Sequence, residues 1–182
     1  LPLSTSWQEI AYLSNRSGLA EIWLLDLTIG SERQLTMADC SEVSIERLGP
    51  EGYQPGVDRF AWSPDGRRIA YLTKCTSAGH MARLSVLDLE TGVVVSTTNH
   101  VDRYSYPSWD PSGNYFIFNQ DLVTTCDMYI ATVSDSNRLE VELVTKGPWE
   151  GCFYCPTWSP DGEFVAYRGP FVGTTSRTYV SI

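Results

Sequence analysis

One short phrase occurs three times along this chain, at residues 60–71, 107–118 and 156–167. Each copy has an apolar segment that ends at a tryptophan, then a turn that reads Ser-Pro-Asp-Gly or Asp-Pro-Ser-Gly, and then a second apolar segment. The tryptophans are Trp62, Trp109 and Trp158, at spacings of 47 and 49 residues. An aromatic strand and a tight turn that return with this period are typical of propeller blades.

The turn in each copy explains why the chain reverses direction there. Proline presets φ at the second turn position, aspartate or serine accepts local backbone hydrogen bonds, and glycine adopts the left-handed conformation. We expect the strand after the turn at 68–73, 115–119 and 164–168, and its counterpart in the first repeat at 9–14. The third strands are expected at 21–27, 83–89, 127–133 and 178–182, and the fourth at 33–36, 93–97 and 139–145. No long segment shows the apolar period of a helix, so we expect little helix.

These strands predict one domain that occupies the whole chain. Its repeats are expected at about 1–38, 58–99, 104–145 and 153–182, with a long loop at 37–58. The predicted fold class is an all-β propeller of about four blades, each an antiparallel sheet of four strands. The array is incomplete at both chain ends, because the first repeat lacks the tryptophan phrase and the last stops in its third strand.

The repeat also resembles a known family. The Trp-Ser-Pro-Asp-Gly turn at 62–66, the following Ile69-Ala70-Tyr71, and strands such as 22–27 and 33–36 are similar to the TolB-like (WD-type) β-propeller repeat. This resemblance covers essentially the whole chain. It implies four-stranded blades around an axis and a role in holding partners. Related blades form the non-catalytic domain of prolyl-oligopeptidase-type enzymes. TolB-like propellers usually have six blades, whereas this chain has material for about four.

The charge balance restricts the partners. The chain has 22 acidic and 13 basic residues, a net charge of -9, and lacks the basic stripe typical of nucleic-acid binding. It has no apolar run of the roughly 20 residues that span a bilayer, so we expect neither nucleic-acid binding nor membrane insertion. The chain begins at Leu1 rather than Met, and we expect it to be processed or excised from something longer. Five cysteines favour an oxidising compartment, and the expected location is extracellular or periplasmic.

The alternation of strand direction places all five cysteines in loops on one side of the blades. Three interpretations remain open: disulfides, partly buried free thiols, or a metal site. For disulfides, neighbouring loops predict the pair Cys40–Cys75 and a bond from Cys126 to Cys152 or, as the less favoured choice, Cys155. The Cys152–Cys155 spacing suits zinc, but no second pair with that spacing exists, so we expect no bound metal.

The same loops supply candidate contact residues for a protein partner, since long loops on a rigid scaffold often carry function. The candidates are Tyr53, His80, His100, Trp149 and Tyr154. For Trp149 the alternative is packing over the blade top. Asn15-Arg16-Ser17 matches an N-glycosylation sequon, which makes Asn15 a candidate glycan site. The acidic residues of the long loop and its end lack calcium-loop spacing and are expected to be solvated; they are Asp39, Glu42, Glu46 and Asp58.

The chain ends are candidates for assembly through unpaired strand edges. The residues concerned are Leu1, Leu3, Tyr179, Val180 and Ile182. Three arrangements are open: the ends share a blade within one molecule, another chain supplies the missing strand, or the sequence is a fragment of a longer propeller.

No catalytic motif is present. The chain has no Gly-x-Ser-x-Gly elbow, no phosphate-binding glycine loop, and two histidines with no nucleophile motif nearby. We therefore expect a chain without enzymatic activity or cofactor. The predicted function is a non-catalytic extracellular scaffold that binds a protein partner or copies of itself. The alternative is the accessory propeller domain, or a fragment, of a larger secreted hydrolase of the prolyl-oligopeptidase type.

Overall fold

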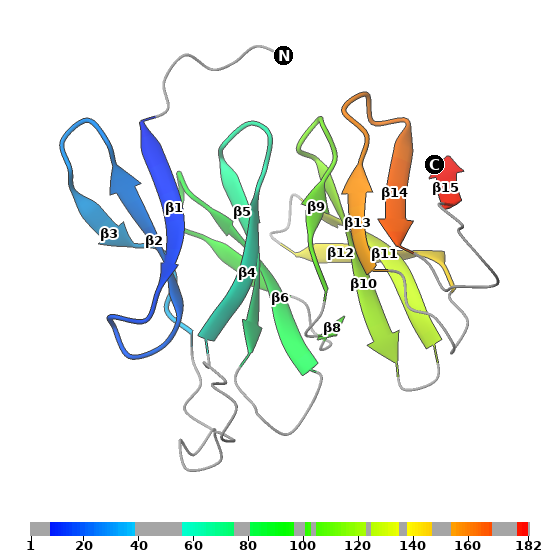
Figure 1. Ribbon diagram of the computed structural model, residues 1–182, viewed down its shortest axis with the longest axis horizontal. Helices are drawn as coiled ribbons and strands as arrows, with labels where there is room; N and C mark the ends of the chain where they lie inside the picture. The colour runs from blue at the N-terminus through cyan, green and yellow to red at the C-terminus, as the bar shows by residue number, and fades with distance from the viewer. Residues whose placement is uncertain are drawn as a thin grey trace. The chain divides into compact units, whose positions relative to one another are not determined.

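The computed structural model describes most of the chain as strands and turns. The described residues are 8–38, 56–74, 81–96, 101–102, 105–122, 125–134, 138–146, 154–168 and 178–181. They form four β-sheets and contain no helix (Figure 1). The chain divides into two compact units, one of residues 1–58 with 73–78 and the other of residues 59–72 with 79–182.

The first sheet consists of β1 (Glu9–Ser14), β2 (Glu21–Asp26) and β3 (Glu32–Gln34), in that order. The strands are antiparallel, and Tyr12 lies opposite Trp23, which lies opposite Gln34. The β2–β3 turn is closed by Asp26, whose carboxylate accepts hydrogen bonds from the backbone N–H and the hydroxyl of Thr28. Such an Asx turn is the local chemistry that the aspartate and the following polar residue favour.

A buried carboxylate holds the segment that follows β3. The Glu21 side chain is 2% exposed, and it accepts hydrogen bonds from the Thr36 hydroxyl at 2.6 Å and the Ala38 N–H at 2.7 Å. The Thr36 oxygen in turn accepts the Ile22 N–H at 2.9 Å. Both carboxylate oxygens thus have partners, as a buried charge requires.

The second sheet contains the first full copy of the repeat. Its path is β4 (Gly56–Trp62), β5 (Arg68–Lys74), β6 (Met81–Asp88) and β7 (Val94–Ser96), and the short β8 (Val101–Asp102) pairs with β6.

The third and fourth sheets repeat this order. The third runs β12 (Leu139–Thr145), β11 (Thr125–Val133), β10 (Tyr115–Leu122) and β9 (Ser108–Trp109). The fourth runs β13 (Tyr154–Trp158), β14 (Phe164–Arg168) and β15 (Thr178–Ser181). In all three turns that follow a phrase tryptophan, the glycine has a positive φ of 71–76°, as the phrase predicts.

The all-β fold class is confirmed, and the strands after each turn lie where the pattern predicts them. Two details differ. The predicted strand 33–36 ends at Gln34: the Leu35 N–H still donates to the Ile22 carbonyl, but the Ile22 N–H donates to the Thr36 hydroxyl rather than to a backbone carbonyl. The short strand β8 was not predicted, because two residues carry no readable periodicity.

Aromatic packing joins the second and third sheets. Trp109 is buried, and its indole N–H donates to the Ala61 carbonyl of β4 at 3.1 Å. The Trp109 and Phe116 rings lie 4.9 Å apart, within a cluster that also includes Ala70 and Leu84. Trp109 thus packs between sheets, as its repeat position predicts. Trp62 and Trp158 are only half-buried, although aromatic residues at repeat spacing usually pack in the core.

Candidate functional site

The repeat gives each sheet two faces that can be compared between sheets. We define the front face of a sheet as the side that carries the residue seven places after the phrase tryptophan: Ile69, Phe116 and Val165. Because side chains alternate along a strand, the next residue lies on the opposite side, the back face. The third sheet shows both: Phe116 on its front packs with Trp109, and Ile117 on its back packs with Val165 of the fourth sheet.

The first sheet departs from this pattern on its front face. Its strand β1 reads Ile-Ala-Tyr at residues 10–12, as β5 does at residues 69–71, so Ile10 occupies the position of Ile69. Ile10 is 46% exposed, whereas Ile69, Phe116 and Val165 are 0%, 0% and 1% exposed. The same repeat position is therefore a core position in three sheets and a surface position in the first.

Strand register identifies the rest of this surface. Ile10 lies opposite Leu25, and Tyr12 opposite Trp23, and residues opposite each other share a face. We call these four residues, Ile10, Tyr12, Trp23 and Leu25, the first-sheet front face. Tyr12, Trp23 and Leu25 are half-buried, so the surface is a largely apolar patch on a rigid sheet.

An arginine lies across this face. The turn that joins β1 to β2 is closed by a hydrogen bond from the Gly18 N–H to the Asn15 carbonyl, and it carries Arg16. The Arg16 guanidinium carbon lies 3.6 Å from the centre of a Trp23 ring and 5.7 Å from that of Tyr12. This is cation–π geometry, which favours a flat arginine over an indole.

Hydrogen bonds hold Arg16 in that position. It donates to the Glu32 carboxylate at 2.6 Å and to the Tyr12 oxygen at 2.6 Å. The Tyr12 hydroxyl donates to the other Glu32 oxygen at 2.6 Å. The three polar groups form a closed triangle above Trp23.

The triangle shifts the acid–base properties of its members. The Tyr12 hydroxyl, followed by Arg16, lowers the pKa of the Glu32 carboxyl below its ordinary value. The same hydrogen bond to Glu32 is the main reason that the pKa of Tyr12 is raised. Both side chains lie at the surface, where solvent weakens such effects.

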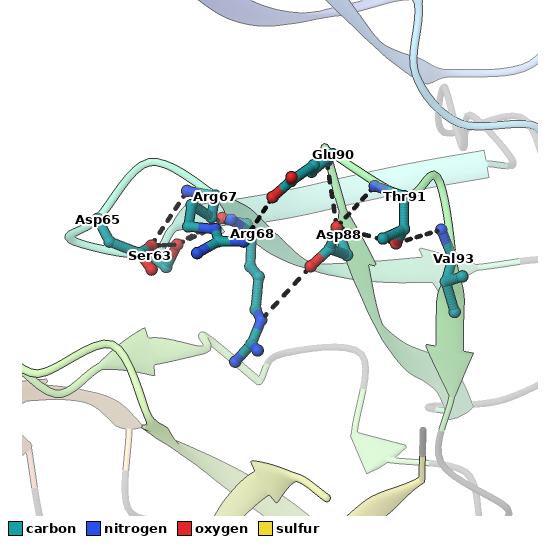
Figure 2. Close-up of polar contacts among 8 residues, drawn as sticks. All are labelled: Ser63, Asp65, Arg67, Arg68, Asp88, Glu90, Thr91 and Val93. Carbon is teal, nitrogen blue, oxygen red and sulfur yellow. Dashed lines mark hydrogen bonds and ion pairs between the residues drawn. The ribbon is translucent and has the colours of Figure 1, made fainter. Parts of the chain in front are cut away.

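A second polar cluster ties the turns at one end of the second sheet, and Figure 2 shows it. The Asp88 carboxylate accepts hydrogen bonds from the backbone N–H groups of Glu90 and Thr91 at 3.1 and 2.8 Å. Arg68 lies 3.9 Å from Asp88, and Arg67 forms an ion pair with Glu90. A hydrogen bond from the Leu89 N–H to the Arg67 carbonyl joins the two turns directly.

The role of this second cluster is structural. The Ser63 hydroxyl donates to Asp65 at 2.5 Å, and the same oxygen accepts the Arg68 N–H at 2.9 Å, which completes the Ser-Pro-Asp-Gly turn (Figure 2). The Arg67–Glu90 pair is more than 60% exposed on both sides and contributes little to stability. Each charge here has an internal partner, so the cluster presents no unmatched charge to a ligand.

Few of the predicted site residues lie in the described part of the chain. Asn15 is exposed, beside Arg16 in the β1–β2 turn. Cys155 is an exposed free thiol with a φ of 51°. The following lie outside the described residues or have undescribed side chains: Leu1, Leu3, Cys40, Tyr53, Cys75, His80, His100, Cys126, Trp149, Cys152, Tyr154, Tyr179, Val180 and Ile182. The predicted disulfides, contact loops and assembly edges therefore remain predictions.

Asp58, the acidic residue at the end of the long loop, lies 2.6 Å from the ammonium group of Lys74. Asp39, Glu42 and Glu46 lie outside the described residues. Within the described ranges, no group of three or more His, Cys, Asp or Glu side chains is placed to bind a metal ion. No helix in those ranges has the length and hydropathy needed to cross a membrane.

Sequence reasoning missed the first-sheet front face. The glycosylation sequon contains Arg16 and the predicted strand 9–14 contains Tyr12, but neither pattern indicates an exposed face. The signal for this face in the sequence is Tyr12. It occupies the repeat position of Tyr71, Phe118 and Tyr167, but its own repeat lacks the tryptophan phrase.

Together these sheets and turns define a β-propeller array. The crystal structure of TolB from Acinetobacter baumannii is similar, with a TM-score of 0.61 and 20% identity over 96% of this chain and 38% of that one. The propeller domain of the Trilobed protease from Pyrococcus furiosus has a TM-score of 0.56 and 18% identity over 94% of this chain and 49% of that one. The TolB-like propeller fold is thus shared.

An enzyme is among the similar structures as well. A prolyl endopeptidase matches with a TM-score of 0.62 and 17% identity over 90% of this chain and 25% of that one. An uncharacterised protein of Agrobacterium fabrum is 26% identical over 106 residues, which are 58% of this chain and 33% of that protein. No family model matches. The chain therefore spans between a quarter and a half of the length of these proteins.

Proposed function

We propose that this chain is a non-catalytic propeller scaffold that binds a protein partner through the first-sheet front face, in an extracellular or periplasmic location. The observation that carries the proposal is the exposure of Ile10, at a repeat position that is buried in the other three sheets. Monomeric proteins seldom leave ordered apolar faces uncovered, and such faces mark interaction sites.

The composition of this face supports a protein partner. Trp, Tyr and Arg are the residues that most often carry binding energy at protein interfaces, and Trp23, Tyr12 and Arg16 lie together here. The hydrogen bonds to Glu32 and Tyr12 support one conformation of Arg16, which reduces the side-chain entropy that binding would cost.

The location rests on separate grounds. Five cysteines in this chain favour an oxidising compartment. The exposed thiol of Cys155 is compatible with either redox state, and only the thiol content of protein isolated from its source tests the location. Blocking free thiols with an alkylating reagent before denaturation would count them; five alkylated cysteines would contradict an oxidising location.

The binding proposal is tested by site-specific photocrosslinking in the source cells. A benzophenone amino acid at Ile10 should give covalent adducts with protein after irradiation. The matched control is the same group at Ile29, which is 74% exposed but lies in the β2–β3 turn, off the first-sheet front face. Equal adduct yields at both positions, or no adduct at either, would contradict the proposal.

A second candidate is the accessory propeller of a larger hydrolase. The likeness to a prolyl endopeptidase over 90% of this chain favours it. Under this alternative the adduct from Ile10 would be internal to one longer polypeptide, and no new band of higher mass would form. Peptidase activity that co-purifies with the native full-length polypeptide would also favour the alternative.

A further inference from the structure

The packing of the described sheets suggests which surface fits the first-sheet front face. The back face of the third sheet packs against the front face of the fourth, where Ile117 and Met128 contact Val165. The backbone N–H of Trp158 also donates to the Ser108 hydroxyl across this contact, at 3.4 Å. A front face in this repeat is therefore covered by the back face of another sheet.

One back face is left open in the described part of the chain. Ala166 lies on the back of the fourth sheet, since it follows Val165 in β14. It is exposed, whereas its repeat counterparts Ala70 and Ile117 are fully buried. Thr157, which lies opposite Ala166 in β13, is exposed as well.

Both open faces carry exposed apolar side chains: Ile10 is 46% exposed on the first, and Phe164, two places before Ala166 in β14 and so on the same back face, is 41% exposed on the second. Ala70, the counterpart of Ala166 on the second sheet, belongs to the same core cluster as the large rings of Trp109 and Phe116. A small back residue thus receives large front residues, which is how close packing is achieved. The first-sheet front face offers such large residues in Tyr12 and Trp23.

We propose that the partner is a second copy of this chain, whose fourth-sheet back face, around Ala166, packs on the first-sheet front face. This inference rests on the proposed function and names its partner. The contact uses two different surfaces of the chain, so it is heterologous and propagates head to tail into a ring or a filament. Because each copy has a net charge of -9, we expect association to strengthen as added salt screens their repulsion.

The test measures mass by sedimentation velocity for the wild type and two variants. Ile10→Glu places a charge in the front face and Ala166→Glu places one in the back face; each variant alone should be monomeric. A mixture of the two should form a dimer of one copy of each, because each retains the surface that the other lacks. Ile29→Glu, on the exposed turn, should assemble like the wild type.

Several outcomes would overturn the inference. One is a wild type that stays monomeric at high protein and salt concentration. Another is a mixture of the two variants that remains monomeric. If a variant fails to fold, two other measurements test the inference: the assembly of the wild type and the photocrosslink from Ile10. The crosslinked adduct should have twice the mass of the chain and contain the peptide with Ala166. An adduct with a different protein would contradict the second copy yet leave the proposed binding function intact.

Discussion

Gly56 lies against the backbone of Ala20 so closely that no side chain fits between them. A Cβ atom on Gly56 would lie 2.2 Å from the Ala20 carbonyl oxygen and 2.7 Å from its nitrogen. The next N–H, of Val57, donates to that oxygen at 2.6 Å. This parallel bridge joins the start of β4 to the residue before β2, within one unit of the chain.

Gly56→Ala should therefore destabilise the protein by more than about 3 kcal/mol, since the new methyl group meets backbone and φ is +113°. Gly18→Ala is the control, because Gly18 has a φ of +107° but nothing within 4 Å of its Cβ position. The control should show only the conformational cost, about 1–2 kcal/mol. Urea denaturation measures both, and equal losses would show that the Ala20 contact is unimportant.

Thr36 should matter through its hydroxyl rather than its shape. Thr36→Val removes one of the two hydrogen-bond partners of the buried Glu21 carboxylate and the partner of the Ile22 N–H, so we expect a loss of about 2–4 kcal/mol in unfolding free energy. Thr36→Ser keeps the oxygen and should cost clearly less than the valine variant. Thermal denaturation measures the stability of the two variants. A valine variant as stable as the serine variant would refute the role of the hydroxyl.

Asn119 is a core position that carries a polar side chain. It is fully buried, neither its amide nitrogen nor its oxygen has a hydrogen-bond partner among the described residues, and its repeat counterpart is Leu72. Asn119→Leu should therefore stabilise the protein by about 1 kcal/mol or more. The exposed Asn114→Leu should change stability by less than about 0.5 kcal/mol. A destabilised Asn119→Leu protein would mean that the amide makes contacts important for folding.

The Arg16–Tyr12–Glu32 triangle should be visible in a titration. Since the pKa of Glu32 is lowered on folding, its contribution to stability is present above its unfolded pKa and is lost as pH falls through the folded value. Tyr12→Phe should raise the pKa of Glu32 towards its ordinary range, as measured by carboxyl NMR. The pKa of Asp26, lowered chiefly by Thr28, should not move. An unchanged Glu32 pKa would show that the Tyr12 hydrogen bond does not form in solution.

Much of the fold could be predicted because its signals are local. The Ser-Pro-Asp-Gly turns close with hydrogen bonds among residues a few places apart, as between Ser63 and Arg68. Strand alternation likewise indicated β1, β12 and β14 at their observed bounds. The C-terminal end of β3 could not be predicted, because it depends on the Thr36 hydroxyl, which bonds to the distant Glu21 and Ile22.

By itself, the sequence determined the all-β class, the turns and the order of strands, since these depend on φ preferences and period-two patterns within a few residues. Only the tertiary structure decided which front face stays open and that Arg16 covers Trp23. The physical reason is that burial of a strand position depends on residues distant in the sequence, which the local pattern does not encode. Ile10 and Ile69 have the same local pattern, yet Ile10 is 46% exposed and Ile69 is fully buried.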